Sequence, residues 1–268
     1  MTKDESPMNI RIITFNIRYD KPDPDNQDWR IRRDAIAALI QEYHPDIIGT
    51  QEGKAHQLLD LHRRLPNYQS IGGDRTGTGT GEHCAIFYNQ DRLKCLDNGD
   101  FYLSDTPDIA GSISPEWGNP APRMATWAVF SVAQVSKTIT CFNTHLDYTS
   151  AKARELGARL IRDRMIHCHP DNTYLFLTGD FNAEPGSLPR EILSDSSTNS
   201  MILHDALAGV ELEKQQSIHG FTGEAFAAVD TIYYDSRLRQ ETVTVDNRKW
   251  QGIFPSDHFP VIANFVND

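Results

Sequence analysis

The segment Tyr174–Thr178 is a continuous apolar run of the length of one β-strand. Because neighbouring side chains of a strand point to opposite faces, such a run predicts a strand buried on both faces. Other strand-like segments, including Ile10–Asn16 and Thr138–Thr144, alternate along the chain with amphipathic helical ones such as Trp29–Tyr43. A chain with these features must place further layers on both sides of its central strands.

Hairpin-like strand pairs and crossover helices together predict an α/β (α+β) fold with four layers. In this α/β/β/α sandwich, two mixed sheets pack face to face and helices cover their outer faces. The chain has 268 residues, 39% of them hydrophobic, and no composition shift marks a boundary. We therefore expect a single domain over residues 9–268, preceded by a disordered tail at residues 1–8.

The charge balance restricts the class of partner. Lys and Arg number 26 against 37 Asp and Glu, a net charge of −11, which disfavours a protein that holds long nucleic acid by charge. The chain shows no signal-peptide pattern, no apolar run of about 18 residues, and no CxxC pair among its four cysteines. These features predict a cytoplasmic protein with free thiols and no membrane span, and they leave the oligomeric state open.

Polar residues stand at the ends of several predicted strands. Core packing does not predict Asn, Asp, Glu or His at five strand ends, so we expect these groups to converge on one site. Oxygen donors of this kind suit Mg²⁺, or Mn²⁺ in its place. The segments concerned are Phe15-Asn16, Gln51-Glu52, Asn143–Asp147, Gly179–Asn182 and Ser256–His258.

The same segments belong to eight blocks that resemble the endonuclease/exonuclease/phosphatase superfamily, which has the deoxyribonuclease-I-like fold, between Ile10 and Phe265. The order of the blocks matches the family's order, and TFNIRY, PRMATW and HGFTG look most like its small bacterial-type members. The blocks are TFNIR (14–18), QE (51–52), GEHCAIFY (81–88), PRMATW (122–127), NTHLD (143–147), GDFNAEP (179–185), VDTIYY (229–234) and SDHFPV (256–261).

The resemblance implies roles for the carboxylates and amides. Glu52 matches the principal metal carboxylate and Asp257 a second acidic ligand, with Asn16 near both the metal and the phosphate. Asp180 matches the residue that orients or deprotonates the attacking water. Asn182 matches the neighbouring residue that holds the nucleophile or the phosphate.

The resemblance also implies two catalytic histidines. His145 and His258 match those that flank the scissile phosphate, with Glu82 hydrogen-bonded to His145 and Asp230 to His258. A carboxylate behind an imidazole fixes its tautomer and raises its pKa, so that it can donate a proton near neutral pH. Arg123 is expected to neutralise a phosphate oxygen, since its planar fork fits that geometry.

The sequence thus predicts a Mg²⁺-dependent phosphoester hydrolase in which water attacks a phosphodiester or phosphomonoester in line. A small-molecule, lipid or sugar phosphate is the expected substrate, and an endonuclease or exonuclease acting on DNA or RNA is the alternative. A catalytically silent binding module on the same fold is a hypothesis of another class. Such modules usually lack some of the polar positions, whereas this chain has them all.

Overall fold

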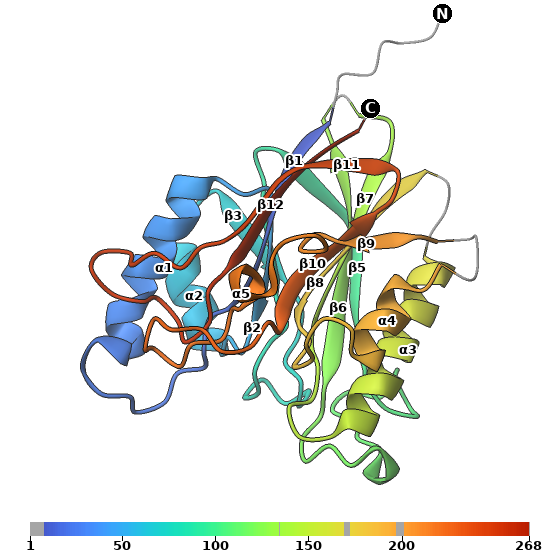
Figure 1. Cartoon of the computed structure of the whole chain (residues 1–268), viewed down its shortest axis with the longest axis horizontal. Helices are drawn as coiled ribbons and strands as arrows, with labels where there is room; N and C mark the ends of the chain where they lie inside the picture. The colour runs from blue at the N-terminus through green and yellow to red at the C-terminus, as the bar shows by residue number, and fades with distance from the viewer. Residues whose placement is uncertain (1–7, 134, 169–171, 197–200, 268) are drawn as a thin grey trace, which may run out of the picture.

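Two mixed β-sheets pack face to face at the centre of the molecule, and helices cover the outer face of each (Figure 1). The computed structural model describes residues 8–133, 135–168, 172–196 and 201–267. Each sheet has six strands in this part of the chain. The predicted four-layer α/β/β/α sandwich is confirmed.

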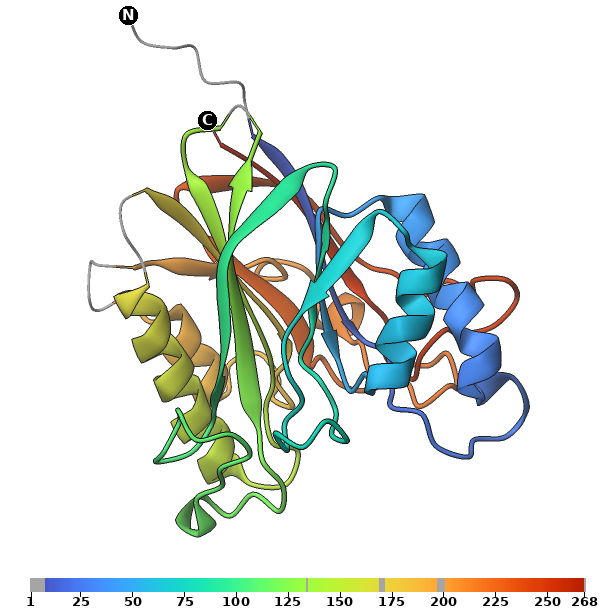
Figure 2. The same ribbon diagram turned by 180° about the vertical axis from the view of Figure 1, so that it is seen from behind.

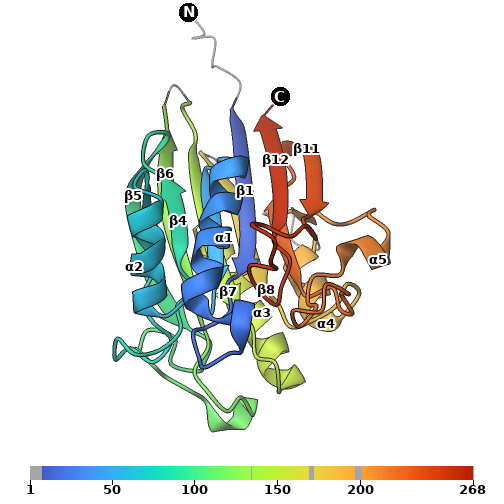
Figure 3. The same ribbon diagram turned by 90° about the vertical axis from the view of Figure 1, so that its left-hand side faces the viewer.

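The first sheet contains both chain ends of the described structure. Strand β1 lies between β12, which is antiparallel to it, and β2, which is parallel to it. Helices α1 (Trp29–Tyr43) and α2 (Ala55–Arg64) cover the outer face, which Figure 3 shows toward the viewer. In order across the sheet, the strands are β11 (Leu238–Val245), β12 (Val261–Asn267), β1 (Asn9–Asn16), β2 (Ile47–Gln51), β4 (Ile86–Asn89) and β3 (Tyr68–Ile71).

The second sheet has helices α3 (Ala151–His167) and α4 (Leu188–Ser194) on its outer face. None of the helices among the described residues is long and apolar enough to pass through a membrane. The short elements are η1 (Asp25–Gln27), η2 (Pro115–Trp117) and α5 (Leu212–Gln215). In order across the sheet, the strands are β5 (Leu93–Tyr102), β6 (Met124–Val132), β7 (Thr138–His145), β8 (Thr173–Asp180), β10 (Asp230–Asp235) and β9 (Leu203–Asp205).

Strand β8 explains why the apolar run is continuous. Tyr174 and Phe176 belong to the core between the two sheets, whereas Leu175 and Leu177 belong to the core beneath α3 and α4. All eight residues of the strand are buried. The burial of this strand on both faces, as the sequence predicts, follows from its place between two hydrophobic layers.

Some elements differ from the sequence prediction. Strand β5 was not predicted, because it lies at the sheet edge and most of its residues are exposed or half-buried (blue-green in Figure 2). Met8, which the sequence assigned to the tail, is 2% exposed and packs in the core between the sheets. The rest of the predicted tail, residues 1–7, lies outside the described residues.

A buried polar bridge joins the two sheets. Gln51 Nε2 and Thr178 Oγ1 both donate to Asn143 Oδ1, at 2.7 and 3.0 Å. Asn143 Nδ2 donates to the backbone carbonyls of Thr50 and Ala85, at 2.8 and 3.0 Å. Because buried amides must be hydrogen-bonded, this bridge fixes how the strands of one sheet lie against those of the other.

Close approach of the sheets at this bridge requires Gly49. A Cβ atom at this position would lie 2.0 Å from Thr178 Oγ1. We expect Gly49→Ala to lower the free energy of unfolding by about 2–3 kcal/mol, because the core must shift to admit the methyl group. Urea unfolding followed by circular dichroism measures this change.

The matched control is Gly73→Ala. Its methyl group would meet only the end of the Asp100 side chain, at 3.0 Å, so we expect a smaller change. Equal stability of Gly49→Ala and the wild-type protein would contradict the close packing of the sheets.

Candidate active site

Five buried polar side chains gather at one end of the two sheets, where β1 ends and the chain enters β12 (lower part of Figure 1). In the second sheet, the pairing of β7, β8 and β10 aligns three of them, one from each strand, in register. The strand order therefore brings together residues far apart in the sequence. The five are Asn16, His145, Asp180, Asp230 and His258.

The carboxylate of Asp180 is at the centre of this group. Its Oδ2 accepts a hydrogen bond from Asn16 Nδ2 at 3.0 Å and lies 3.5 Å from His145 Nε2. The same oxygen lies 3.9 Å from His258 Nε2. Asp180 Oδ1 accepts from the backbone N–H of Asn182 at 3.0 Å. One carboxylate thus contacts four of the residues that the sequence singled out.

The charges around Asp180 set unusual protonation states. Burial, and then the negative charge of Asp230, raise the pKa of Asp180 to about 7. His258 Nδ1 bonds Asp230 Oδ2 at 2.8 Å, so the expected contact between these two residues is present. Burial opposes protonation of His258, but the charge of Asp230 outweighs it and the pKa of His258 rises to about 10. His258 is therefore an imidazolium at neutral pH.

The surroundings and the pKa of the second histidine, His145, differ from the prediction. Glu82 was expected to bond His145, but both of its oxygens bond the guanidinium of Arg75, each at 2.8 Å. Burial, and then the nearby charges of Arg123 and His258, hold the pKa of His145 well below its usual value. The expectation of a raised pKa is therefore wrong for His145, which is a neutral imidazole.

Of the predicted metal carboxylates, Glu52 follows β2 and Asp257 precedes β12, the two strands that flank β1, which ends at Asn16. Glu52 accepts from Asn16 Nδ2 at 3.0 Å and from the backbone N–H of Tyr19 at 3.1 Å. Its φ of 68° is strained for a non-glycine residue, and such strain is common at functional sites. Asp257 Oδ2 accepts from Arg18 Nη1 at 2.7 Å, a contact that was not predicted.

A different set of residues has the closest potential ligand atoms. Among the described residues, Asp180, Asp230 and His258 form the one set of three His, Cys, Asp or Glu side chains whose ligand atoms lie within 4.8 Å of one another. The raised pKa of His258 places a proton in this set, shared along the bond to Asp230. A protonated His258 disfavours a cation in this set, and Glu52 offers the hard oxygen donors that a divalent cation prefers.

Arg123 borders a small cavity beside this group. The cavity measures about 10 Å³, which is room for one water-sized atom, and Arg75, Glu52 and His145 also line it. Arg123 Nε donates to Asp147 Oδ2 at 3.2 Å. Arg123 Nη1 is buried and has no hydrogen-bond partner in the part of the chain that the structure describes. An unpaired buried N–H group of a cation calls for an anionic oxygen.

The sequence does not predict Arg75, which lies in the Gly/Thr-rich segment Gly72–Gly81, where no block of the resemblance supplies a site residue before Gly81. The segment folds around the carboxylate of Asp74, which accepts from the backbone N–H groups of Thr76, Gly79 and Gly81 at 2.9, 2.7 and 3.0 Å. The hydroxyl of Thr76 also donates to this carboxylate, and this bond together with the backbone bonds outweighs burial and lowers the pKa of Asp74 to about 2. An Asp before alternating Thr and Gly residues was the available signal.

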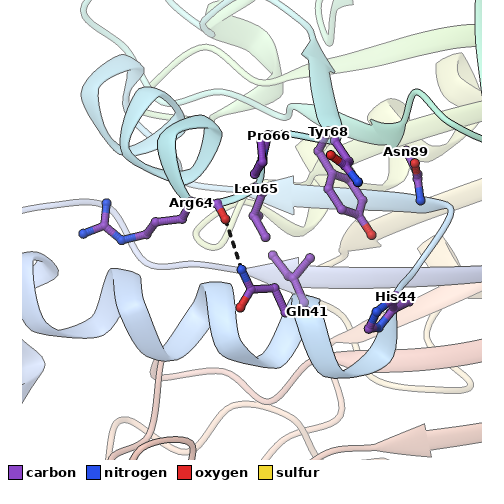
Figure 4. Close-up of a pocket in the computed structure, with 9 residues that line it drawn as sticks. Gln41, His44, Arg64, Leu65, Pro66, Tyr68 and Asn89 are labelled. Atoms are coloured by element: carbon purple, nitrogen blue, oxygen red, sulfur yellow. Dashed lines mark hydrogen bonds between the residues drawn. The ribbon is translucent and has the colours of Figure 1, made fainter.

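A larger hollow lies elsewhere, between α1 and the turn from α2 to β3 (Figure 4). It has a volume of about 270 Å³, and Gln41 on one wall donates to the backbone carbonyl of Arg64 on the other, at 3.1 Å. None of the five gathered side chains lines it, so we assign the site to the strand ends.

The fold and the site together define a class: a four-layer α/β protein with a buried acid–base group at its strand ends. The chain matches the model of the Endonuclease/Exonuclease/phosphatase family over residues 13–258, and it belongs to that family. Members of this family are hydrolases that act on phosphoesters.

Solved structures of similar proteins share the whole fold. A family protein from Bacteroides thetaiotaomicron is 29% identical with a TM-score of 0.86, over 98% of this chain and 99% of that one. A mannosyl-6-phosphatase of the same bacterium is 28% identical with a TM-score of 0.84, over 96% and 99%.

A curated relative, the uncharacterized protein L388 of Acanthamoeba polyphaga mimivirus, is 32% identical over 168 residues, or 58% of this chain. This match spans 60% of the relative's length, and that to a second mimivirus protein spans 18% of its length.

The raised pKa of Asp180 predicts that this carboxylate destabilises the protein. Above pH 3.8 the unfolded chain loses the proton that the folded protein keeps up to about pH 7, so the destabilisation grows with pH over this range. We expect Asp180→Asn to gain about 1–3 kcal/mol of unfolding free energy at pH 8 in EDTA, and less at pH 5. Denaturant unfolding at the two pH values measures the gain, and a loss of stability at pH 8 would contradict it.

Proposed function

We propose that this chain is a divalent-metal-dependent hydrolase of phosphate esters. The observation that carries the proposal is the position of Asp180. Its carboxylate contacts Asn16 and lies within 4 Å of two imidazole rings, the neutral one of His145 and the protonated one of His258. A base with a pKa of about 7 next to a fixed acid is suited to proton transfer near neutral pH.

Asp180 and Asn182 would hold the attacking water. Asn182 donates its side-chain N–H to the backbone carbonyl of Leu146 at 3.0 Å, which fixes the orientation of the amide. Its amide oxygen then accepts one hydrogen of the water while Asp180 takes the other as a proton. The water attacks phosphorus opposite the leaving oxygen, in a single in-line displacement.

The two histidines would serve different tasks. His258, held as an imidazolium by Asp230, stabilises negative charge that develops on the phosphoryl oxygens. His145 is neutral, so it donates one hydrogen bond without adding a charge. The unpaired Nη1 of Arg123 is the donor for a further phosphate oxygen.

The residues present fit Mg²⁺ or Mn²⁺. Among the described residues, the hydrogen bonds to Glu52 come from neutral N–H groups, and no Lys or Arg side chain there forms an ion pair with it. Glu52, Asp257 and Asn16 offer hard oxygen donors and would hold the ion. When bound, the metal supplies Lewis-acid stabilisation of the phosphate oxygens.

A small phosphorylated substrate is favoured over nucleic acid. A groove of about 550 Å³ continues from Asn182 over the start of α3, and its lining includes Lys152 and Arg154 together with Glu155 and Glu184. Its volume suits a sugar-sized group, and its mixed charges differ from the basic track of a nuclease. The net charge of −11 and the mannosyl-6-phosphatase among the similar structures also support this proposal.

Removal of the metal tests the first part of the proposal. We expect EDTA-treated protein to lose hydrolysis of p-nitrophenyl phosphate esters, and added Mg²⁺ or Mn²⁺ to restore it. Glu52→Gln should raise the Mg²⁺ concentration needed for half-maximal rate at least about tenfold, because one charged ligand is lost. The control is Glu211→Gln, since the Glu211 side chain is 71% exposed. Full activity in EDTA would contradict metal dependence.

Substitution of the acid and the base tests the chemistry. We expect Asp180→Asn and His258→Ala each to lower kcat about a hundredfold or more, because each removes a group needed only in the transition state. Asp108→Asn and His56→Ala are the matched controls, with side chains 77% and 54% exposed. Near-normal kcat in Asp180→Asn or His258→Ala would contradict the assignment, and a folded protein without any activity toward phosphate esters would favour the silent binding module.

A further inference from the structure

We propose that Arg75 and Arg123 form a two-guanidinium clamp on a terminal phosphoryl oxygen and that this clamp makes the enzyme specific for phosphate monoesters. The inference rests on the proposed function and adds to it the class of ester. It assigns Glu82 the task of positioning Arg75, in place of the expected contact with His145.

The first observation is that Arg75 is held in one orientation. Its Nη1 and Nη2 each contact a different oxygen of Glu82, at 2.8 Å. Its backbone N–H donates to the backbone carbonyl of Glu82 at 2.9 Å. A guanidinium fixed by two parallel bonds loses little further freedom when it binds a ligand.

The loop on which Arg75 lies is also ordered. The carboxylate of the preceding residue, Asp74, is buried and accepts three backbone N–H groups of the loop. A Cβ atom at Gly81 would lie 2.4 Å from Asp74 Oδ1, so the loop closes tightly on this carboxylate. Both the side chain and the backbone of Arg75 are therefore set before any ligand arrives.

The second observation is the size of the cavity that Arg75 and Arg123 share. The space holds about one water-sized atom and is bordered by His145 and Glu52, which belong to the catalytic group. An unesterified phosphoryl oxygen carries more negative charge than an ester oxygen, so it is the atom that best fits this space between the two guanidinium groups. The preference between monoesters and diesters therefore depends on the charge of the phosphate group.

The third observation concerns charge. Arg123 is 4% exposed, and its Nη1 has no hydrogen-bond partner among the described residues. The two contacts of the Arg75 side chain go to one carboxylate, although a guanidinium has five N–H donors. A phosphate monoester is a dianion above its second pKa, near 6, whereas a diester is a monoanion. Glu82 is the partner of Arg75 and Asp147 that of Arg123, but each guanidinium has further N–H donors for a ligand, and two such groups stabilise a dianion more strongly than a monoanion.

The proposed reaction transfers the phosphoryl group from the alcohol to water. Water forms the new P–O bond and the bond from phosphorus to the leaving oxygen breaks. Asp180 takes the proton of the water, and the alcohol leaves with a proton from solvent or from the acid group. The clamp holds a spectator oxygen throughout, so it changes the preference between substrates and not the order of steps.

The experiment compares p-nitrophenyl phosphate with bis-(p-nitrophenyl) phosphate in the presence of Mg²⁺. We expect the wild-type protein to prefer the monoester. Arg75→Ala should lower kcat/KM for the monoester about a hundredfold, and for the diester less than about threefold. Arg75→Lys should recover only part of the loss, because an ammonium group lacks the planar fork.

Glu82→Gln tests the positioning of Arg75. An amide offers one acceptor oxygen in place of two, so we expect KM for the monoester to rise more than kcat falls. The same variant should leave kcat/KM for the diester nearly unchanged. Arg159→Ala, whose side chain is 54% exposed on α3, is the control and should match the wild-type protein. Equal melting temperatures exclude unfolding as the cause.

A binding measurement separates this inference from the proposed function. We expect inorganic phosphate to bind the Mg²⁺-loaded wild-type protein at least about tenfold more tightly than dimethyl phosphate, and Arg75→Ala to remove the difference. Preference for the diester, or equal losses for both esters in Arg75→Ala, would overturn the clamp while hydrolysis stands. If neither ester is hydrolysed, the proposed function fails, and equal binding of the two anions would overturn the clamp as well.

Discussion

The buried contact of Asn143 with Gln51 and Thr178 determines where the two sheets meet. The site depends on this contact because its residues come from both sheets. Asn16 ends a strand of the first sheet, and Asp180 ends a strand of the second. Their hydrogen bond spans the boundary between the sheets, so a change in sheet spacing would separate the amide from the carboxylate.

Two histidines in one buried site differ in charge, one neutral and one cationic, because their neighbours differ. His258 bonds the carboxylate of Asp230, whereas His145 lies near the charge of Arg123. Asp180 lies within 4 Å of both rings. The site therefore has an acid in His258, a base in Asp180 and a neutral hydrogen-bond donor in His145, and it needs no change in conformation to bring them together.

The sequence predicts the features that depend on local pattern. The burial of β8 on both faces could be predicted from the two-residue period of a strand, and the polar residues at strand ends from residue types that core packing does not explain. The partner of Glu82 could not, since the choice between His145 and Arg75 depends on how a loop folds around Asp74. Strand β5 was missed for a related reason: an exposed edge strand needs no apolar alternation.

The central claim is that one water molecule, held by Asp180 and Asn182, displaces the leaving group in a single step. The stereochemistry at phosphorus tests this claim most directly. The substrate is an aryl phosphorothioate made chiral with oxygen-18 and hydrolysed in oxygen-17 water, and ³¹P NMR gives the configuration of the product. A single displacement predicts inversion at phosphorus. Retention would show a phosphorylated enzyme intermediate and would contradict the account.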